Sequence, residues 1–185
     1  MSKSFIIFIF SLFMTSSLYS QVMVTKLIGK NSKNSGVGFG VFSFLDFPLH
    51  INQMENQSIR FEWVDFAYYP PINSYIPSII AYISNKLGYR YIFSETKTGF
   101  YIEPEAGFGQ VVINEPDSTN DKTAYGLALA LEVGYSLEVG QRGNSLIFGL
   151  KYENDLPSSY QYNANSIGFR FAFCFQLLRR KSNYY

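Results

Sequence analysis

The sequence is poor in charged residues, cysteine and histidine. Charged residues make up 16% of its 185 residues and the formal net charge is +1, whereas a typical soluble domain carries about 25% charged residues. Because it has no excess of basic residues, the chain lacks the electrostatic signature of a nucleic-acid-binding protein. The single cysteine, Cys174, excludes an intramolecular disulfide. We therefore expect a fold without a covalent cross-link and without nucleic acid as a partner.

Long apolar runs are also scarce. The one continuous run covers residues 5–14, and this is too short for a transmembrane helix, which needs about 20 residues. Lys3 precedes the run and the polar stretch TSSLYS follows it, which is the order of a secretory signal peptide. We predict that residues 1–20 are a signal peptide and that residues 21–185 form one barrel domain. A retained N-terminal anchor helix is the alternative.

What the chain does contain is strict alternation of apolar residues with small or polar ones. In residues 123–139 the odd positions are mostly Tyr, Leu and Val, whereas the even positions are mostly Ala, Gly, Ser and Glu. This period places the two sets on opposite faces of a β-strand. No convincing amphipathic helix interrupts the pattern, so we predict an all-β chain. The predicted strands are 22–29, 36–46, 58–69, 79–94, 99–113, 123–139, 144–154 and 166–178.

The less apolar face distinguishes a membrane barrel from a soluble β-protein. In a soluble protein this face would meet water and carry Lys, Glu and Thr, but here Gly, Ala and Ser dominate it. Small residues fit the interior of a narrow barrel. The opposite face is then an exposed apolar belt, which suits lipid. We predict an eight-stranded antiparallel up-and-down transmembrane β-barrel, with a secreted soluble β-barrel as the alternative.

The connections between the predicted strands fall into two classes. TKTG (96–99) and QRGN (141–144) are tight turns on the side of the chain termini, and longer polar connections lie on the other side, at residues 70–78, 114–122 and 155–165. This asymmetry is typical of transmembrane barrels, which have short periplasmic turns and long external loops. One segment departs from it, because residues 47–57 are predicted to form a long connection on the periplasmic side.

The predicted inward face carries five positive and five negative side chains. Isolated charges in a narrow interior are costly, so we expect them to pair and to fill the barrel without an open pore. The tight turns place Arg90 opposite Glu103 and Glu132 opposite Lys151. The full predicted network is Arg60, Glu62, Lys86, Arg90, Glu103, Glu105, Glu132, Lys151, Glu153 and Arg170.

The strand at residues 58–69 carries the only tryptophan of the chain. We expect Trp63 to face outward with Ile59 and Phe61, opposite to Arg60 and Glu62. The alternation falters at residues 64–66, which predicts a β-bulge.

The last predicted strand resembles the C-terminal assembly signal of bacterial outer-membrane barrels, through Ser166, Gly168, Phe171 and Phe173. The position of Gln21 after the signal peptide, and the stretch GYRYIFSETKTGFYIEPEAGFG at 88–109, resemble small outer-membrane β-barrel proteins of the Bacteroidota. The chain departs from the usual ending on the aromatic residue, because it continues with a tail that contains Arg179, Arg180 and Lys181. The resemblance implies a location in the cell outer membrane. It also implies as partners outer-membrane lipid, lipopolysaccharide and, during insertion, the barrel assembly machinery.

Residues that could support catalysis or bind a metal are few. His50, the one candidate base, is expected in the 47–57 connection as a solvated loop residue. Asp117, Asn120 and Asp121 lack the spacing of a full calcium loop. We therefore predict no catalytic residue, no cofactor and no metal, and interpret the chain as a non-enzymatic barrel that is structural or binds an unidentified extracellular partner through its external loops. A lipid-modifying barrel enzyme is the alternative.

Overall fold

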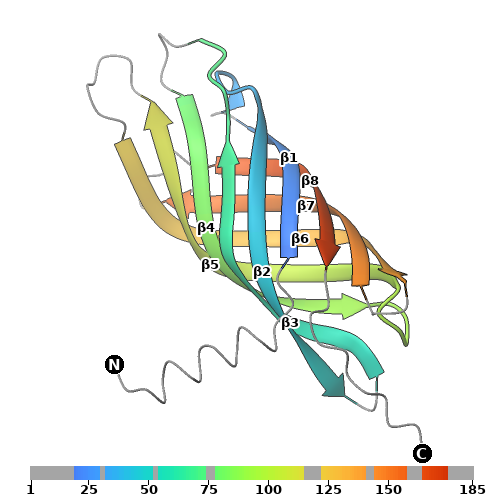
Figure 1. Ribbon diagram of the computed structural model, residues 1–185. Helices are drawn as coiled ribbons and strands as arrows, with labels where there is room; N and C mark the ends of the chain where they lie inside the picture. The colour runs from blue at the N-terminus through green and yellow to red at the C-terminus, as the bar shows by residue number, and fades with distance from the viewer. Residues whose placement is uncertain are drawn as a thin grey trace, which may run out of the picture.

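The structure is a closed barrel of antiparallel strands. The computed structural model describes residues 19–29, 32–51, 54–73, 78–114, 122–140, 144–157 and 164–174. Each strand pairs with its sequence neighbours, and β1 pairs with β8, which closes the sheet (Figure 1). The predicted eight-stranded up-and-down barrel is thus confirmed. The strands are β1 (Tyr19–Ile28), β2 (Val37–Ile51), β3 (Met54–Tyr68), β4 (Ser78–Ile92), β5 (Gly99–Asn114), β6 (Lys122–Val139), β7 (Asn144–Pro157) and β8 (Ala164–Cys174).

Some sequence predictions lie outside the described residues. These are most of the predicted signal peptide, the acidic segment with Asp117, Asn120 and Asp121, and the tail with Arg179, Arg180 and Lys181. β1 begins at Tyr19, on the signal-peptide side of the predicted cleavage site. Within the described ranges, no helix is both long enough and apolar enough to cross a membrane.

The two ends of the barrel differ in their connections. Where β1 begins and β8 ends, the strands are joined through residues 52–53, 93–98 and 140–143, and we call this the turn end. The opposite end, which we call the loop end, carries residues 29–36, 69–77, 115–121 and 158–163.

Residues 47–57 do not form the long connection that we predicted. β2 continues to Ile51, β3 begins at Met54, and the two strands pair through Leu49 and Gln57. Pro48 made this part of β2 difficult to recognise as a strand in the sequence, because proline is rare within strands. It is tolerated because, among the described residues, β2 pairs with β1 only as far as Phe42, so that Pro48 lies in an edge segment, where a missing N–H costs little. His50 is therefore a strand residue and not a loop residue.

The facing of the strands follows the alternation in the sequence. In β6 the odd-numbered residues 125–137 are 37–63% exposed, whereas Ala128, Glu132 and Ser136 are at most 3% exposed. The small and charged residues therefore face the interior. The apolar residues form the outer surface of the barrel.

A β-bulge in β3 reverses this alternation partway along the strand. Trp63 and Val64 together oppose the single residue Asn85 of β4, and the register with β2 shifts at the same place. At this bulge the side-chain amide of the outward-facing Asn85 donates a hydrogen bond to the Trp63 carbonyl. Trp63 lies outward with Ile59 and Phe61, as predicted.

Glycines on the inward face make room for large side chains. A Cβ atom added to Gly38 would lie 2.5 Å from the ring of Tyr69, and one added to Gly134 would lie 2.6 Å from the Tyr101 hydroxyl. Tyr69 and Tyr101 are almost completely buried. At these two positions, the bare backbone of one strand makes room for a tyrosine on the neighbouring strand.

Replacing Gly38 by alanine should destabilise the barrel, because the new methyl group overlaps the Tyr69 ring. We expect a loss of about 1–3 kcal/mol in the free energy of unfolding, the usual cost of overpacking. Urea titrations of the protein in lipid vesicles would measure it. The variant G38A should cost less when Tyr69 is already replaced by leucine, and the remaining cost should come from the Tyr68 carbonyl oxygen, which would lie 2.9 Å from the new methyl group. Equal costs in both backgrounds would show that the ring is not the obstacle.

Candidate functional site: the charged barrel interior

The interior of the barrel is packed with ionisable side chains. All ten residues of the predicted network are at most 5% exposed, and Asp65 and Asp155 are buried with them. The described residues thus place five cations and seven carboxylates inside the barrel. Buried charges are tolerated only when they are paired and hydrogen-bonded, so the contacts among them decide what this site is.

The turn-end cluster is built on two arginines that share one carboxylate. Glu103 Oε2 lies 2.6 Å from Arg90 Nε and 3.3 Å from Arg60 Nη1. Arg90 also approaches Glu132, at 3.6 Å, and the Tyr101 hydroxyl donates to Glu132. Strands β3 to β6 are thereby joined across the lumen.

The loop-end cluster is built on two lysines. Lys86 Nζ lies 2.8 Å from Asp65, 2.5 Å from Glu153 and 3.0 Å from Glu62. Lys151 Nζ lies 3.0 Å from the same oxygen of Asp65 and 2.9 Å from the same oxygen of Glu62. Carboxylates shared by two ammonium groups hold both lysines in place.

Arg170 of β8 connects the two clusters. Its Nη1 lies 2.6 Å from Glu132 Oε2 in the turn-end cluster, and its Nη2 forms an ion pair with Glu62 in the loop-end cluster. It also lies 3.6 Å from Glu105. Because of Arg170, the charges form one continuous network from β3 to β8.

Aromatic rings support the three guanidinium groups. The guanidinium carbon of Arg60 lies 3.4 Å from the centre of the Phe44 ring. The guanidinium carbon of Arg170 lies 3.3 Å from the centre of the Phe42 ring. The Tyr101 ring lies 3.9 Å from Arg90 in the same way. Cation–π contacts of this kind strengthen when they are desolvated. They also fix each arginine at a defined position in the lumen.

The register of the hairpins agrees with the sequence analysis. Arg90 is bonded to Glu103, and Glu132 is the register partner of Lys151, as predicted. The ion pairs of Lys151, however, reach across the lumen to Glu62, Asp65 and Glu105. Pairing between adjacent strands therefore accounts for only part of the ion-pair network. In a narrow barrel, long side chains from opposite walls also meet across the interior.

The side chains of the lumen that sequence reasoning missed include two carboxylates and two phenylalanines. Asp65 lies beyond the bulge in β3, where the inward face changes from even to odd positions, and Asp155 lies beyond the predicted end of its strand. Phe42 and Phe44 could have been found, because they share the face of Gly38 and Gly40. The bulge itself was signalled by the faltering alternation.

The predicted C-terminal assembly residues occupy both faces of β8. Ser166 and Gly168 face the interior, where Gly168 leaves room for Thr25. Phe171 is 42% exposed on the outer surface and its ring contacts Phe148 at 5.3 Å. Phe173 pairs in register with Leu146.

The chemistry of the interior is that of ion pairing, in which each of the five cations contacts at least one carboxylate and the carboxylates outnumber the cations by two. Ser84 Oγ lies 2.6 Å from Lys86 Nζ, but both side chains are 1% exposed and are surrounded by the other members of the network. Apolar side chains lie beyond the charges toward both ends, such as Leu27 and Ile113 toward the loop end and Ile147 toward the turn end. A group enclosed in this way holds strands of the wall together through its ion pairs.

Comparison with known proteins supports the fold. No family model matches the chain, and no curated protein matches it significantly. Among solved structures, the Neisserial surface protein A is similar, with a TM-score of 0.60 and 16% identity over 87% of this chain and 97% of that one. The attachment invasion locus protein Ail of Yersinia pestis gives a TM-score of 0.52 and 13% identity over 86% of this chain and 97% of its own. Both are small bacterial outer-membrane barrels, and the likeness at these identities concerns the fold.

Proposed function

We propose that this protein is a non-enzymatic barrel of the bacterial outer membrane, of the type found in Bacteroidota. The turn end faces the periplasm and the loop end faces the outside. The charged network fills the lumen and stabilises the wall, and contacts with other molecules are made through the loops. Lipopolysaccharide and outer-membrane lipid surround the barrel, and the barrel assembly machinery recognises Ser166, Gly168, Phe171 and Phe173 during insertion.

The apolar outer surface carries this proposal. Each of the eight strands contributes exposed large apolar side chains, and Phe108, Phe169 and Phe100 are 77%, 71% and 69% exposed. Monomeric soluble proteins rarely expose a continuous apolar patch larger than a few hundred Å². Where all eight strands are paired, the closed barrel leaves no unpaired sheet edge, which is what a hydrocarbon environment requires.

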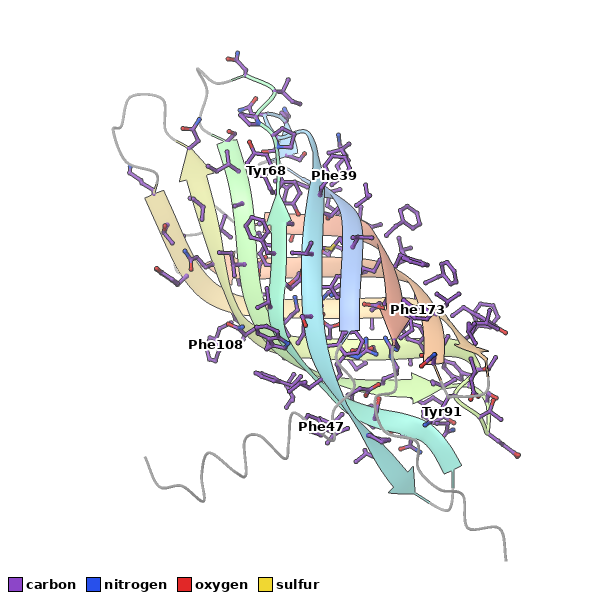
Figure 2. The ribbon with its side chains drawn as sticks, viewed as in Figure 1. Phe39, Phe47, Tyr68, Tyr91, Phe108 and Phe173 are labelled. Atoms are coloured by element: carbon purple, nitrogen blue, oxygen red, sulfur yellow. The ribbon has the colours of Figure 1, made fainter. Side chains whose placement is uncertain are left out.

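Aromatic residues lie toward both ends of this surface. Figure 2 shows Phe39 and Tyr68 on the loop-end part of β2 and β3, and Phe47 and Tyr91 near the turn end. Outer-membrane barrels place such residues at the two membrane interfaces. The apolar band between the two groups is the part that we assign to the membrane interior.

The fluorescence of Trp63 tests the location of the protein. Trp63 is the single tryptophan and lies on the outer surface, 40% exposed. In vesicles whose acyl chains carry bromine, its fluorescence should be strongly quenched, whereas iodide in the water should have little effect. The measurement compares brominated with unbrominated vesicles of the same composition.

The protein unfolded in urea beside the same vesicles is the control, and should show the reverse pattern. Quenching of the folded protein by iodide but not by bromine would contradict the membrane location. Recovery of the protein from the periplasm without detergent would contradict it independently.

A further inference from the structure

The last part of β2 has a partner strand on one side only. Among the described residues, β2 pairs with β1 from Val37 to Phe42, whereas its pairing with β3 continues to Ile51. We call residues 45–51 the free edge, because they pair with β3 alone. It lies at the turn end, where Figure 1 shows the hairpin of β2 and β3 extending past the beginning of β1. Backbone groups along such an edge can pair with another extended chain.

The end of β8 lies level with the start of the free edge. Cys174 is the register partner of Tyr19 on one side of β1. On the other side of β1, Gln21 is the partner of Phe42, and the same register places Tyr19 opposite Phe44. The residue after Cys174 is therefore level with the first residue of the free edge, about two strand spacings away, or roughly 10 Å. Since β8 and β2 are both antiparallel to β1, the chain leaves β8 in the direction in which the free edge runs.

One strand position separates the end of β8 from the free edge. Only residues that precede β1 could extend β1 into this position, and they belong to the predicted signal peptide, residues 1–20. Cleavage after Ser20 removes them. In the mature chain the position is then open to a strand from elsewhere.

We propose that the C-terminal segment, residues 175–185, occupies this position and pairs with the free edge as a parallel strand. The inference rests on the proposed outer-membrane location and its signal peptide. The free edge is about 20 Å long, and moving across by one strand spacing takes about 5 Å more. Because the eleven residues of the segment can extend to about 36 Å, they are long enough for both.

The outer faces of the two strands match. β8 places its odd-numbered residues outward, and the same alternation continues through Phe175 and Leu177. On the free edge, Leu45 and Phe47 are on the outer face, and Phe47 is the register partner of the outward Ile59. In the level register the two apolar pairs lie side by side, and neighbouring apolar side chains of this kind stabilise a sheet.

A buried carboxylate oxygen provides the match on the inner face. Asp46 Oδ2 lies 3.8 Å from Arg60 Nη2, while Asp46 Oδ1 is buried and accepts no hydrogen bond from a described residue. Gln176 is the segment residue that the level register places beside Asp46, and its amide can donate to this oxygen. Because an unpaired buried acceptor is costly, the hydrogen bond favours the pairing.

The covalent link to β8 favours this segment over other occupants. Pro48 lies within the free edge and lacks an N–H, so a chain arriving from solution gains fewer hydrogen bonds there. A tethered segment has an effective concentration of about a millimolar. It therefore pairs where a second copy of the protein would not.

Cysteine cross-linking of the mature protein tests the pairing. In a Cys174→Ser background, Phe47→Cys and Leu177→Cys are combined, and the folded barrel is oxidised in its membrane. Adjacent strands bring Cβ atoms within reach of a disulfide, whereas strands about 10 Å apart do not. We expect an intramolecular disulfide in most molecules, identified by mass spectrometry of the peptides.

A cysteine one strand farther away is the matched control. Ile59 lies outward beside Phe47 on β3 and is 38% exposed. Ile59→Cys should therefore cross-link to Leu177→Cys at least about tenfold less. Moving the second cysteine to Gln176 or Leu178 turns it to the other face, which should lower the yield with Phe47→Cys in the same way.

A second pair keeps the test valid if the first fails to fold, as shown by loss of heat-modifiable migration in gels. Leu45→Cys is then combined with Phe175→Cys. Phe61→Cys, at the register partner of Leu45 on β3, is the control for this pair.

The outcomes separate the pairing from the membrane location. Equal yields at Phe47 and Ile59, yields that do not alternate along the segment, or disulfides formed only between two copies would overturn the pairing and leave the location standing. So would a mature protein that retains residues 1–20. A soluble protein that forms the Phe47→Cys to Leu177→Cys disulfide would overturn the location and leave the pairing standing.

Discussion

Replacing Lys86 by methionine is expected to lower the free energy of unfolding by about 3–5 kcal/mol, the cost of removing one partner from a buried ion pair. Methionine keeps much of the length and volume of lysine but removes its charge. Asp65, Glu62 and Glu153 all lie within 3.0 Å of the Lys86 ammonium group. After the substitution, Lys151 is the one lysine left in the loop-end cluster.

Urea titration in lipid vesicles, followed by the fluorescence of Trp63, measures this cost. Lys26→Met, at an exposed position on the outer face of β1, is the matched control and should change stability little. Adding Glu153→Gln to K86M should recover part of the loss, because a neutral amide replaces an unpaired carboxylate. A loss below about 1 kcal/mol, the value of exposed ion pairs, would contradict the role that we assign to the network.

An arginine placed on the outer surface should be costly in proportion to its depth. Leu131 lies in the middle of β6, and Leu137 lies near its turn end. We expect L131R to cost about 2–4 kcal/mol and L137R about 0–1 kcal/mol, since the penalty falls from the midplane of the bilayer to its interface. The two leucines are 44% and 40% exposed, so depth and not burial separates them.

The same titration in vesicles provides the comparison. A barrel that is surrounded by water would tolerate both arginines almost equally, because both side chains could be hydrated. Small and equal costs for L131R and L137R would therefore contradict the membrane location. A graded cost along the odd positions of β6 would also define the midplane.

The fold was largely predictable because one physical signal runs through most of the chain. Alternation predicted β5 and β6 within a residue of their ends, and it predicted which face of each is apolar. It failed where the chain leaves the regular ladder. Pro48 and the polar residues among positions 50–57 made the hairpin between β2 and β3 unrecognisable in the sequence, because an edge segment tolerates residues that a central strand does not.

The sequence was sufficient to predict most of the charged residues that face the lumen, but not which of them form ion pairs with one another. Within a regular strand, either the even or the odd positions face inward, and this predicts which charges point into the lumen. The extra residue of the bulge in β3 exchanges the two sets, which is why Asp65 was missed. Contacts between distant strands, such as that of Arg170 with Glu62, depend on how far the strands are staggered around the barrel. No local pattern in the sequence carries that information.

The filled interior has a consequence for the membrane that we propose as its location. Each copy of a barrel with an open lumen lets small solutes cross the membrane. The number of such barrels is therefore limited by the solute loss that the cell can tolerate. In this protein, ion pairs and apolar side chains occupy the lumen at successive levels. We therefore expect that many copies can be inserted without raising the permeability of the membrane, which conductance measurements on planar bilayers would test.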